Sequence, residues 1–479
     1  MTASQTTQAA FTNEVAKLLG PKGWQVDRQD MEPWLTDWRG RYTGQALGLA
    51  SPSSIREVGD FVRLCARHGV PIVPQGGNSG MAGGATPDDS GNSVILSLRR
   101  MNAIRSIDKD AKQVVCEAGV ILQNLHDAAE AKQMRFPLTL GGKGSATIGG
   151  LVSTNAGGTQ VLRHGTMRAQ VLGLEAVLAD GSVFDALTVL KKDNRGFDLK
   201  QLLIGSEGTL GIVTAATLRI LPAVTARATA WVGLESISAA RTLLQFVDDT
   251  LADTLEGFEV VPAHCLDSVL DHLPDARSPL KDRHRWNALI ECVSDRCDHA
   301  DLRERLERTL GEAMENGLLD DAAIAANDTQ SEQFWLLRDS ISAAERALGP
   351  AMQHDISVPV EKMPEFVEAA IPAIEQAFPG TRGLAFGHLG DGNVHFHVLA
   401  PDGAVPGKWE ETEGKQISAQ VYRMVTDWGG SISAEHGIGQ MKVDELSRLG
   451  DPVAVFMMRS VKAALDPQGI LNPGKLVPA

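Results

Sequence analysis

The chain has 479 residues, 43% of them hydrophobic and 22% charged, a balance that predicts a soluble globular protein of two or three domains. A net charge of −15 without any block of lysine and arginine excludes nucleic acid as an expected partner, and five cysteines without a CxxC pair favour neither a disulfide framework nor a cysteine-based metal site. The sequence has no leader-like N-terminus and no run of about 18 apolar residues, so we expect a cytoplasmic location, with peripheral membrane association left open.

The first half of the chain alternates predicted helices and short strands. Residues 54–69 carry apolar side chains at helical spacing, and residues 70–77 form a β-branched strand that ends in glycine. Further strand-like runs, bounded by Gly, Asp or Pro, follow at 93–98, 113–120, 172–184 and 211–221. This order predicts an α+β domain over residues 1–222.

The second half has a different pattern. Helical stretches at 235–253 and 301–317 alternate with strands at 227–234 and 286–294, which predicts a substrate-binding domain over 223–410 built on an antiparallel sheet with helices on one face. Two further helices, at 415–430 and 452–467, predict a small helical C-terminal segment, 411–479, that completes the active site.

Glycine is concentrated in three stretches: PQGGNSGMAGG at 74–84, GGKGSATIGGLVSTNAGGT at 141–159 and GSEGTLGIVT at 205–214. In the first, successive backbone N–H groups can turn toward one point and bind phosphate oxygens. In the second, small residues would let a large, flat ligand lie against the backbone. Each stretch taken singly could equally be a set of tight turns in a glycine-rich fold.

Together the three stretches resemble the flavoprotein family of the vanillyl-alcohol oxidase and p-cresol methylhydroxylase type, which binds FAD in two subdomains. The matching segments are PQGGNSG, TIGGLVSTNAGG, RHGTMRAQVLGLEAVLADG and IGSEGTLGIVT. The resemblance implies a pyrophosphate site at Pro74, Gly76, Gly77, Asn78, Ser79 and Gly80, a flavin and ribityl site at Thr147, Gly149, Gly150, Ser153, Thr154, Asn155 and Gly158, and an adenine side near Glu207, Gly208, Ile212 and Val213. Because residues 76–80 contain no His or Cys for flavin attachment, we expect non-covalent FAD.

A predicted hairpin over residues 387–398, GHLGDGNVHFHV, carries three histidines. The dipeptide Asp391-Gly392 favours a two-residue type I′ turn, which would place His388 opposite His395. Cross-strand partners have Cβ atoms about 4.5–5.5 Å apart, near enough for two imidazoles to share a metal. His397 would lie on the same face, one rung further from the turn.

The stretch GGSISAEHGIG, residues 429–439, adds Glu435 and His436, so that a His, His, Glu metal set with an open position for substrate is one interpretation. The other is that the histidines only form hydrogen bonds in a polar turn, since no HExxH motif is present. HLGDGNVH and SAEHGIG resemble the paired signatures of the D-2-hydroxyacid dehydrogenase branch, which includes D-2-hydroxyglutarate and D-lactate dehydrogenases and glycolate oxidase subunits. The resemblance implies that His388, His395 and Glu435 bind a divalent metal, commonly zinc, and that His436 is the general base.

These residue types suit the oxidation of a 2-hydroxyacid. Its hydroxyl and one carboxylate oxygen can bind a metal together, which lowers the hydroxyl pKa and orients the C2–H bond. The imidazole of His436 can accept the hydroxyl proton, and FAD would accept the hydride. The expected product is the 2-oxoacid.

The second domain is expected to bind the remainder of the substrate. Arg338 and Ser342 are four residues apart in a predicted helix and could hold a distal carboxylate, although a surface arginine beside a serine is an equal alternative on the pattern alone. Relatives that act on D-2-hydroxyglutarate carry Lys where Gln353 stands and Asn where His397 stands. D-2-hydroxyglutarate still ranks first among the expected substrates, because Arg338 and the hydroxyl group of Ser342 are present. D-malate and D-lactate are the alternatives.

Two other functions compete with this interpretation. A sugar-lactone or aryl-alcohol oxidase could use the same FAD scaffold without a metal. The chain could also be a flavin-bearing subunit of a glycolate oxidase-like complex that relays electrons. The expected electron acceptor is an electron-transfer flavoprotein, a quinone or a cytochrome, and a homodimer is the default assembly.

Overall fold

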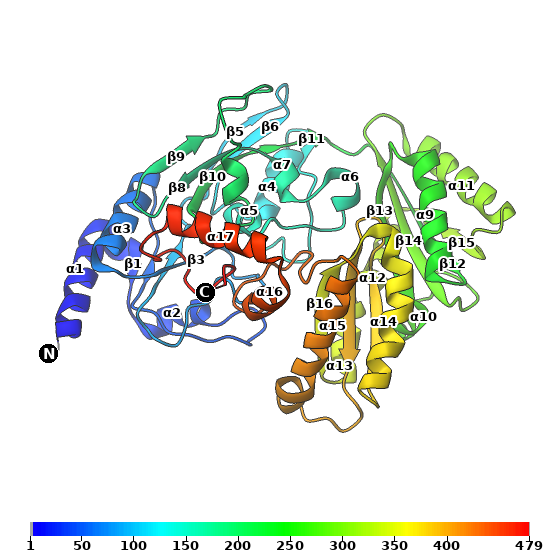
Figure 1. Ribbon diagram of the computed structural model, residues 1–479. Coiled ribbons are helices and arrows are strands. Elements are labelled where there is room, and N and C mark those ends of the chain that lie inside the picture. Colours follow the sequence, from blue (N-terminus) through cyan, green and yellow to red (C-terminus); the bar gives the residue numbers. More distant parts are fainter. Residues whose placement is uncertain (1–2, 479) are drawn as a thin grey trace. The chain divides into compact units, whose positions relative to one another are not determined.

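The computed structural model describes residues 3–478, which separate into two compact units (Figure 1). The first unit comprises the chain up to Gly158, His164–Pro222 and Glu435–Ala479, and the second comprises Thr159–Arg163 and Ala223–Ala434. The chain passes from the first unit to the second between Pro222 and Ala223. The C-terminal part differs from the single segment expected, because residues 411–434 group with the second unit and only Glu435 onward returns to the first.

The two parts of the C-terminal segment belong to different units because their helices pack against different hydrophobic cores. Helix α15 (Lys415–Asp427) buries Ile417, Val421 and Val425 and contacts α14 (Met363–Ala377) and β16 (Ala351–Ser357) in the second unit. Helix α17 (Pro452–Leu465) instead packs Val461 and Leu465 against a core cluster of the first unit.

The first unit contains two main sheets. The first has the strand order β1-β2-β4-β3, formed by Trp24–Gln25, Leu49–Ala50, Val94–Ser97 and Ile72–Gln75, and its β2-β4-β3 part is parallel. The second is antiparallel with the order β5-β6-β10-β8-β9, formed by Ile104–Asp108, Gln113–Glu117, Ile212–Arg219, Val171–Val177 and Val183–Ala186. A short ribbon pairs β7 (Met134–Arg135) with β11 (Leu221–Pro222).

Helix α3 (Ile55–His68) of the first unit begins and ends where local sequence signals predict. It starts after Ser54, whose side chain accepts the Glu57 N–H at 3.2 Å, and ends at Gly69 in the left-handed conformation. The remaining helices are α1 (Ala3–Gly23), α2 (Arg28–Leu35), α4 (Leu122–Glu130), α5 (Ile148–Thr154), α7 (Met167–Gln170), α8 (Lys200–Leu203) and α16 (Val443–Leu449). The short helix α6 (Val161–His164) lies mostly in the second unit, to which Val161–Arg163 belong. Among the described residues, no helix is long and apolar enough to cross a membrane.

The second unit is built on a seven-stranded antiparallel sheet with the order β15-β12-β14-β13-β17-β18-β16. The strands not yet given are β12 (Ala226–Leu234), β13 (Leu255–Pro262), β14 (Trp286–Ser294), β15 (Asp321–Ile324), β17 (Arg382–His388) and β18 (Asn393–Leu399). The helices are α9 (Ile237–Leu251), α10 (Ala263–His272), α11 (His299–Glu315), α12 (Asp328–Asp339) and α13 (Ile341–Leu348), with a 3₁₀ turn at Val360–Lys362 and a π turn at Glu410–Gly414.

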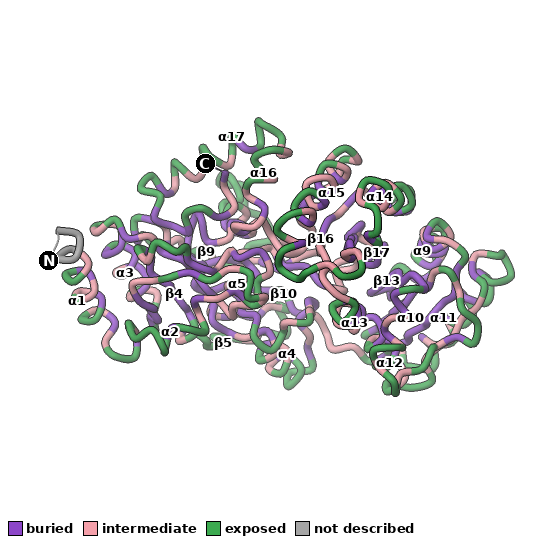
Figure 2. The backbone as a smooth tube through the Cα atoms, turned by 90° about the horizontal axis from the view of Figure 1, so that it is seen from below, coloured by how far each residue is buried: buried purple, intermediate pink, exposed green. Residues whose placement is uncertain are grey.

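Helices cover both faces of this sheet, not one face as predicted. Alternate strand residues such as Trp231, Val261 and Leu289 form a core cluster with side chains of α10, α12 and α13. The intervening residues are also buried, and every position of β13 is buried (Figure 2). A strand that is buried on both sides needs a covering layer on each face, and α9, α11 and α14 supply the second layer.

Candidate active site

The first glycine stretch forms a loop directly after β3 and lines a hollow in the first unit. Gln75, the last residue of β3, donates from Nε2 to Trp34 O at 2.9 Å and to Ala85 O at 2.8 Å, which holds the loop in place. Gly77 permits a close backbone approach, because a Cβ there would lie only 1.7 Å from the Ser145 carbonyl oxygen. The loop therefore presents backbone to the hollow where larger residues would present side chains.

The second glycine stretch continues the same wall through α5. Thr147 caps this helix by accepting the Gly150 N–H at 3.4 Å. Asn155 ends it in the left-handed conformation, and its side-chain oxygen accepts hydrogen bonds from Thr166 Oγ1 and the Arg168 N–H, both at 2.9 Å. The Asn155 side chain thus ties the start of α7 to the end of α5.

The third glycine stretch contains Glu207, which lies beside the last segment of the chain. Its carboxylate accepts the backbone N–H groups of Ile438 at 2.7 Å and Gly439 at 2.8 Å. Burial raises the pKa of the Glu207 carboxyl, and these two N–H groups oppose that shift. Glu207 therefore anchors the chain directly after His436 to the wall of the hollow.

The hollow, with the solvent space at its open mouth included, has a volume of about 1100 Å³. Fifteen of the seventeen residues predicted to contact FAD line it, and Asn155 and Gly158 do not. The sequence missed several lining residues, mostly small or apolar side chains without a chemical signature: Gln75, Ala82, Gly84, Ala85, Leu96, Leu98, Arg99, Ala118, Gly119, Ala146, Leu151, Gly211 and His436, the last singled out only as a base. A lining of backbone N–H groups and small side chains fits a flat ligand that carries phosphate.

The histidine hairpin of the second unit has a different register from the one predicted. Strands β17 and β18 are joined by a four-residue loop, Leu389–Gly392, and His388 pairs with Asn393. His395 pairs with Phe386, and His397 with Leu384, so the predicted pairing of His388 with His395 is wrong. The Asp391 side chain accepts the Asn393 N–H at 3.0 Å, which favours the wider loop over a two-residue turn.

The two histidines nevertheless share one face of the sheet. The register differs from the predicted one by two residues, and because side chains alternate with period two, such a shift leaves each residue on its face. The rings of His388 and His395 are diagonal neighbours with centroids 5.4 Å apart. On β16, Asp355 lies opposite His395 and Gln353 lies opposite His397.

His388 is held by an acidic residue that the sequence did not single out. Glu259 on β13 pairs directly with His388, and its Oε1 lies 2.5 Å from His388 Nδ1. Its Oε2 accepts a hydrogen bond from Arg338 Nε at 2.8 Å. Burial by itself raises the pKa of the Glu259 carboxyl, but His388 and Arg338 outweigh burial and lower the pKa to about 2. Glu259 is therefore an ionised carboxylate in a buried site.

The other imidazole of the pair is neutral. Burial, reinforced by the positive charges of Arg338 and His388, holds the pKa of the His395 imidazole well below its usual range. Neutral imidazole is the form that binds metal ions, so His395 needs to lose no proton to act as a ligand.

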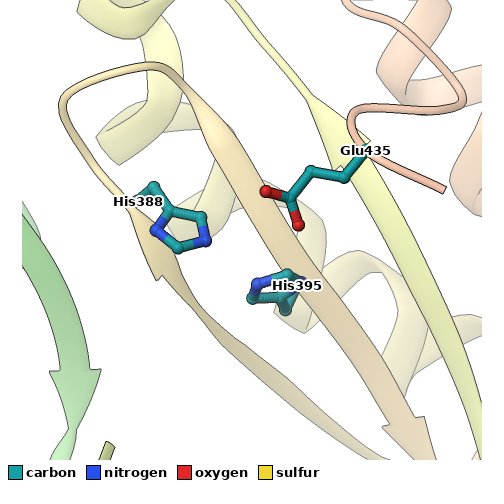
Figure 3. Close-up of side chains that lie close together, drawn as sticks. All are labelled: His388, His395 and Glu435. Atoms are coloured by element: carbon teal, nitrogen blue, oxygen red, sulfur yellow. The ribbon is translucent and has the colours of Figure 1, made fainter. Parts of the chain in front are cut away.

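Glu435 completes a group of possible metal ligands with these histidines. It directly follows Ala434, whose N–H donates to Asp355 O at 3.4 Å, so the chain itself holds Glu435 at this end of the sheet. One ligand atom from each of His388, His395 and Glu435 lies within 4.8 Å of the others. Figure 3 shows the carboxylate of Glu435 pointing toward the two rings. Two imidazoles and a carboxylate are a donor set that fits zinc.

The residues predicted to contact the substrate lie on two kinds of element. Gln353 and His397 lie on the sheet, on the same face as His388 and His395, and Arg338 and Ser342 lie on helices that cover that face. Arg338 and Ser342 belong to two helices, α12 and α13, that meet at Ser340, where one continuous helix was predicted. Arg338 is buried against Phe386, with its guanidinium carbon 5.5 Å from the ring centroid. His397 Nδ1 is hydrogen-bonded to Glu345 of α13, a second buried acidic residue that the sequence did not single out.

Comparisons with known proteins confirm the predicted family. The chain matches the FAD binding domain family over residues 46–186 and the C-terminal domain of FAD linked oxidases over 224–476. It is 37% identical to the mitochondrial D-2-hydroxyglutarate dehydrogenase of Arabidopsis thaliana over 96% of this chain and 80% of that protein, and 36% identical to the Bos taurus protein of the same name over 95% and 81%. The structure of p-cresol methylhydroxylase with substrate bound has a TM-score of 0.75 at 15% identity, covering 99% of this chain and 97% of that one, and shows a shared fold. This chain therefore belongs to the FAD-linked oxidase family, the flavoproteins that its glycine stretches resemble.

Proposed function

We propose that this chain oxidises a D-2-hydroxyacid to the 2-oxoacid, with D-2-hydroxyglutarate as the first-ranked substrate, using non-covalent FAD and a divalent metal. The observation that carries the proposal is the cluster of His388, His395 and Glu435 in a chain that also has an FAD-binding domain. The relatives named D-2-hydroxyglutarate dehydrogenase support the choice of substrate, since they match nearly the whole chain.

In the proposed site, His388, His395 and Glu435 would hold the metal, and the position that three protein ligands leave open would be available to the substrate. The metal supplies Lewis-acid chemistry that lowers the pKa of a neighbouring hydroxyl, and FAD supplies the hydride acceptor. His436, the residue after Glu435, accepts the hydroxyl proton as general base. Its place in the lining of the glycine-rich hollow supports this role, because the proton and the hydride leave neighbouring atoms of the substrate.

The glycine-rich hollow is the proposed FAD site. The loop after β3 would bind the pyrophosphate through its backbone N–H groups, and the residues around α5 would line the flavin. Neither Asn155 nor Gly158 keeps a proposed contact, since both lie outside the lining. No His or Cys in residues 76–80 could form a covalent flavin link, so acid precipitation should release all the flavin into solution.

Arg338, Ser342, Gln353 and His397 are proposed to select the distal end of the substrate. Gln353 and His397 are cross-strand partners, so the two departures from the D-2-hydroxyglutarate pattern lie side by side. Because both departures lie at one place, the part of the proposed site that would contact the distal end of the substrate differs from the D-2-hydroxyglutarate pattern. D-malate and D-lactate therefore remain second candidates.

Turnover of D-2-hydroxyglutarate, D-malate, D-lactate and glycolate with a dye acceptor tests the proposal. We expect the highest kcat/KM for D-2-hydroxyglutarate, complete loss of activity after chelation, and recovery with zinc. Activity that survives chelation would favour a metal-free oxidase. A purified chain that retains flavin and metal yet turns over none of the four acids would favour an electron-relay subunit.

The natural electron acceptor is proposed to be an electron-transfer flavoprotein, a quinone or a cytochrome. A homodimer is the proposed assembly. Reoxidation kinetics of the substrate-reduced protein with each acceptor class, and its mass in solution, test these two points.

A further inference from the structure

Glu259 lies next to the proposed metal ligands without belonging to them. It is 1% exposed, and each of its two oxygens has a different partner, Oε1 with His388 Nδ1 and Oε2 with Arg338 Nε. One partner is a proposed metal ligand and the other a proposed substrate-binding residue. Glu259 is thus the direct physical link between the two.

We propose that Glu259 is a positioning residue that holds His388 in the tautomer and orientation needed for metal binding and simultaneously fixes Arg338. This inference rests on the proposed function, because it takes the metal to bind at His388. It concerns a residue that neither binds the metal nor touches the reacting atoms.

The hydrogen bond determines which nitrogen of His388 can bind a metal. A carboxylate can only accept, so the Nδ1 atom next to Glu259 Oε1 must carry the hydrogen. To bind a metal, His388 must be in its neutral form, and its lone pair is then on Nε2, on the opposite side of the ring. Ligand histidines in metal sites usually donate their other ring N–H to a carboxylate, carbonyl or water, which fixes the ring and raises its basicity.

Stability alone is a weak reason for this arrangement. A buried ion pair loses about as much in desolvation as it gains in attraction, so an apolar residue at Glu259 could stabilise the sheet equally well. Glu259 also occupies the sheet position directly opposite His388, and its carboxylate reaches the Nδ1 atom of that imidazole. The placement therefore favours a role in positioning.

Glu259→Gln tests the inference because an amide has one acceptor and one donor group. If its oxygen accepts from Arg338, its NH₂ faces His388 Nδ1, and the ring hydrogen must move to Nε2, which blocks metal binding. The measurement is the zinc dissociation constant of the metal-stripped flavoprotein, by competition with a chromophoric chelator. We expect Glu259→Gln to weaken zinc binding about 10- to 100-fold, with Glu259→Asp in between because it keeps the charge at a longer reach.

The Glu345–His397 pair supplies a matched control. It has the same chemistry on the same sheet face, but His397 is not a proposed ligand. Glu345→Gln should leave zinc affinity within about twofold of the unaltered chain. Bound flavin absorbance and the thermal unfolding midpoint confirm that each variant is folded.

Zinc binding by Glu259→Gln within about twofold of the unaltered chain, or an equal loss in Glu345→Gln, would overturn the inference. Failure of the unaltered chain to bind zinc would refute the proposed metal site itself. The two failures are thus distinguishable.

Discussion

Replacing Gly387 with alanine should separate the two histidines of the proposed metal site. Gly387 lies directly before His388 and pairs with Val394, the residue before His395. Its φ of +147° is a conformation that L residues rarely adopt, and a Cβ there would lie 2.5 Å from the Asn393 carbonyl oxygen. Ordinary contact begins at 3.4 Å, so the strands must move apart by roughly 0.9 Å.

The expected loss in the free energy of unfolding of Gly387→Ala has two contributions. The unfavourable φ costs about 1–3 kcal/mol, and the clash inside a packed hairpin adds about 1–3 kcal/mol. A displacement of this size also exceeds the tolerance of about 0.2 Å for metal–ligand distances, so zinc affinity should fall at least about tenfold. The assays are the unfolding midpoint in denaturant and zinc competition with a chromophoric chelator.

Gly403→Ala in the same unit is the matched control. Gly403 has a φ of +81°, but a Cβ there would meet nothing within 4 Å, so only the backbone strain of about 1–2 kcal/mol remains. Zinc affinity should be unchanged in this variant. If Gly387→Ala unfolded at the same denaturant concentration as Gly403→Ala and bound zinc normally, the hairpin geometry described above would be refuted.

Three further predictions concern flavin binding and turnover. His436→Ala should retain FAD and zinc but lose most turnover, and near-normal kcat would remove His436 as the base. Glu207→Ala leaves the N–H groups of Ile438 and Gly439 without their acceptor, at about 1.5–3 kcal/mol each, so we expect a lower thermal midpoint and flavin loss on gel filtration. Gly77→Ala should bind little or no flavin, because its Cβ would lie 1.7 Å from a backbone oxygen; a full 450 nm flavin band would contradict the described loop.

Motifs that depend on local chain properties could be predicted from the sequence. The helix that starts after Ser54 and the strand before Gly76 are present as predicted, because capping and hydrophobic periodicity act over a few residues. The glycine stretches predicted most of the lining of the hollow, because only small residues allow a close backbone approach.

The hairpin register could not be predicted in the same way. The sequence favoured a two-residue turn at Asp391-Gly392, but the side chain of Asp391 caps a four-residue loop. His388 and His395 stayed on one face only because the error was two residues, which preserves the alternation of side chains.

The sequence by itself determined the family, the FAD-binding stretches and the residue types of the proposed metal set, because these reside in contiguous motifs with their own chemistry. Only the tertiary structure brought Glu259 to His388 and Arg338, and Glu345 to His397. These contacts join strands and helices separated by 52 to 129 residues. A buried carboxylate in a strand or helix has no local signature, since its partner is chosen by strand order in the sheet and by which helices cover the sheet.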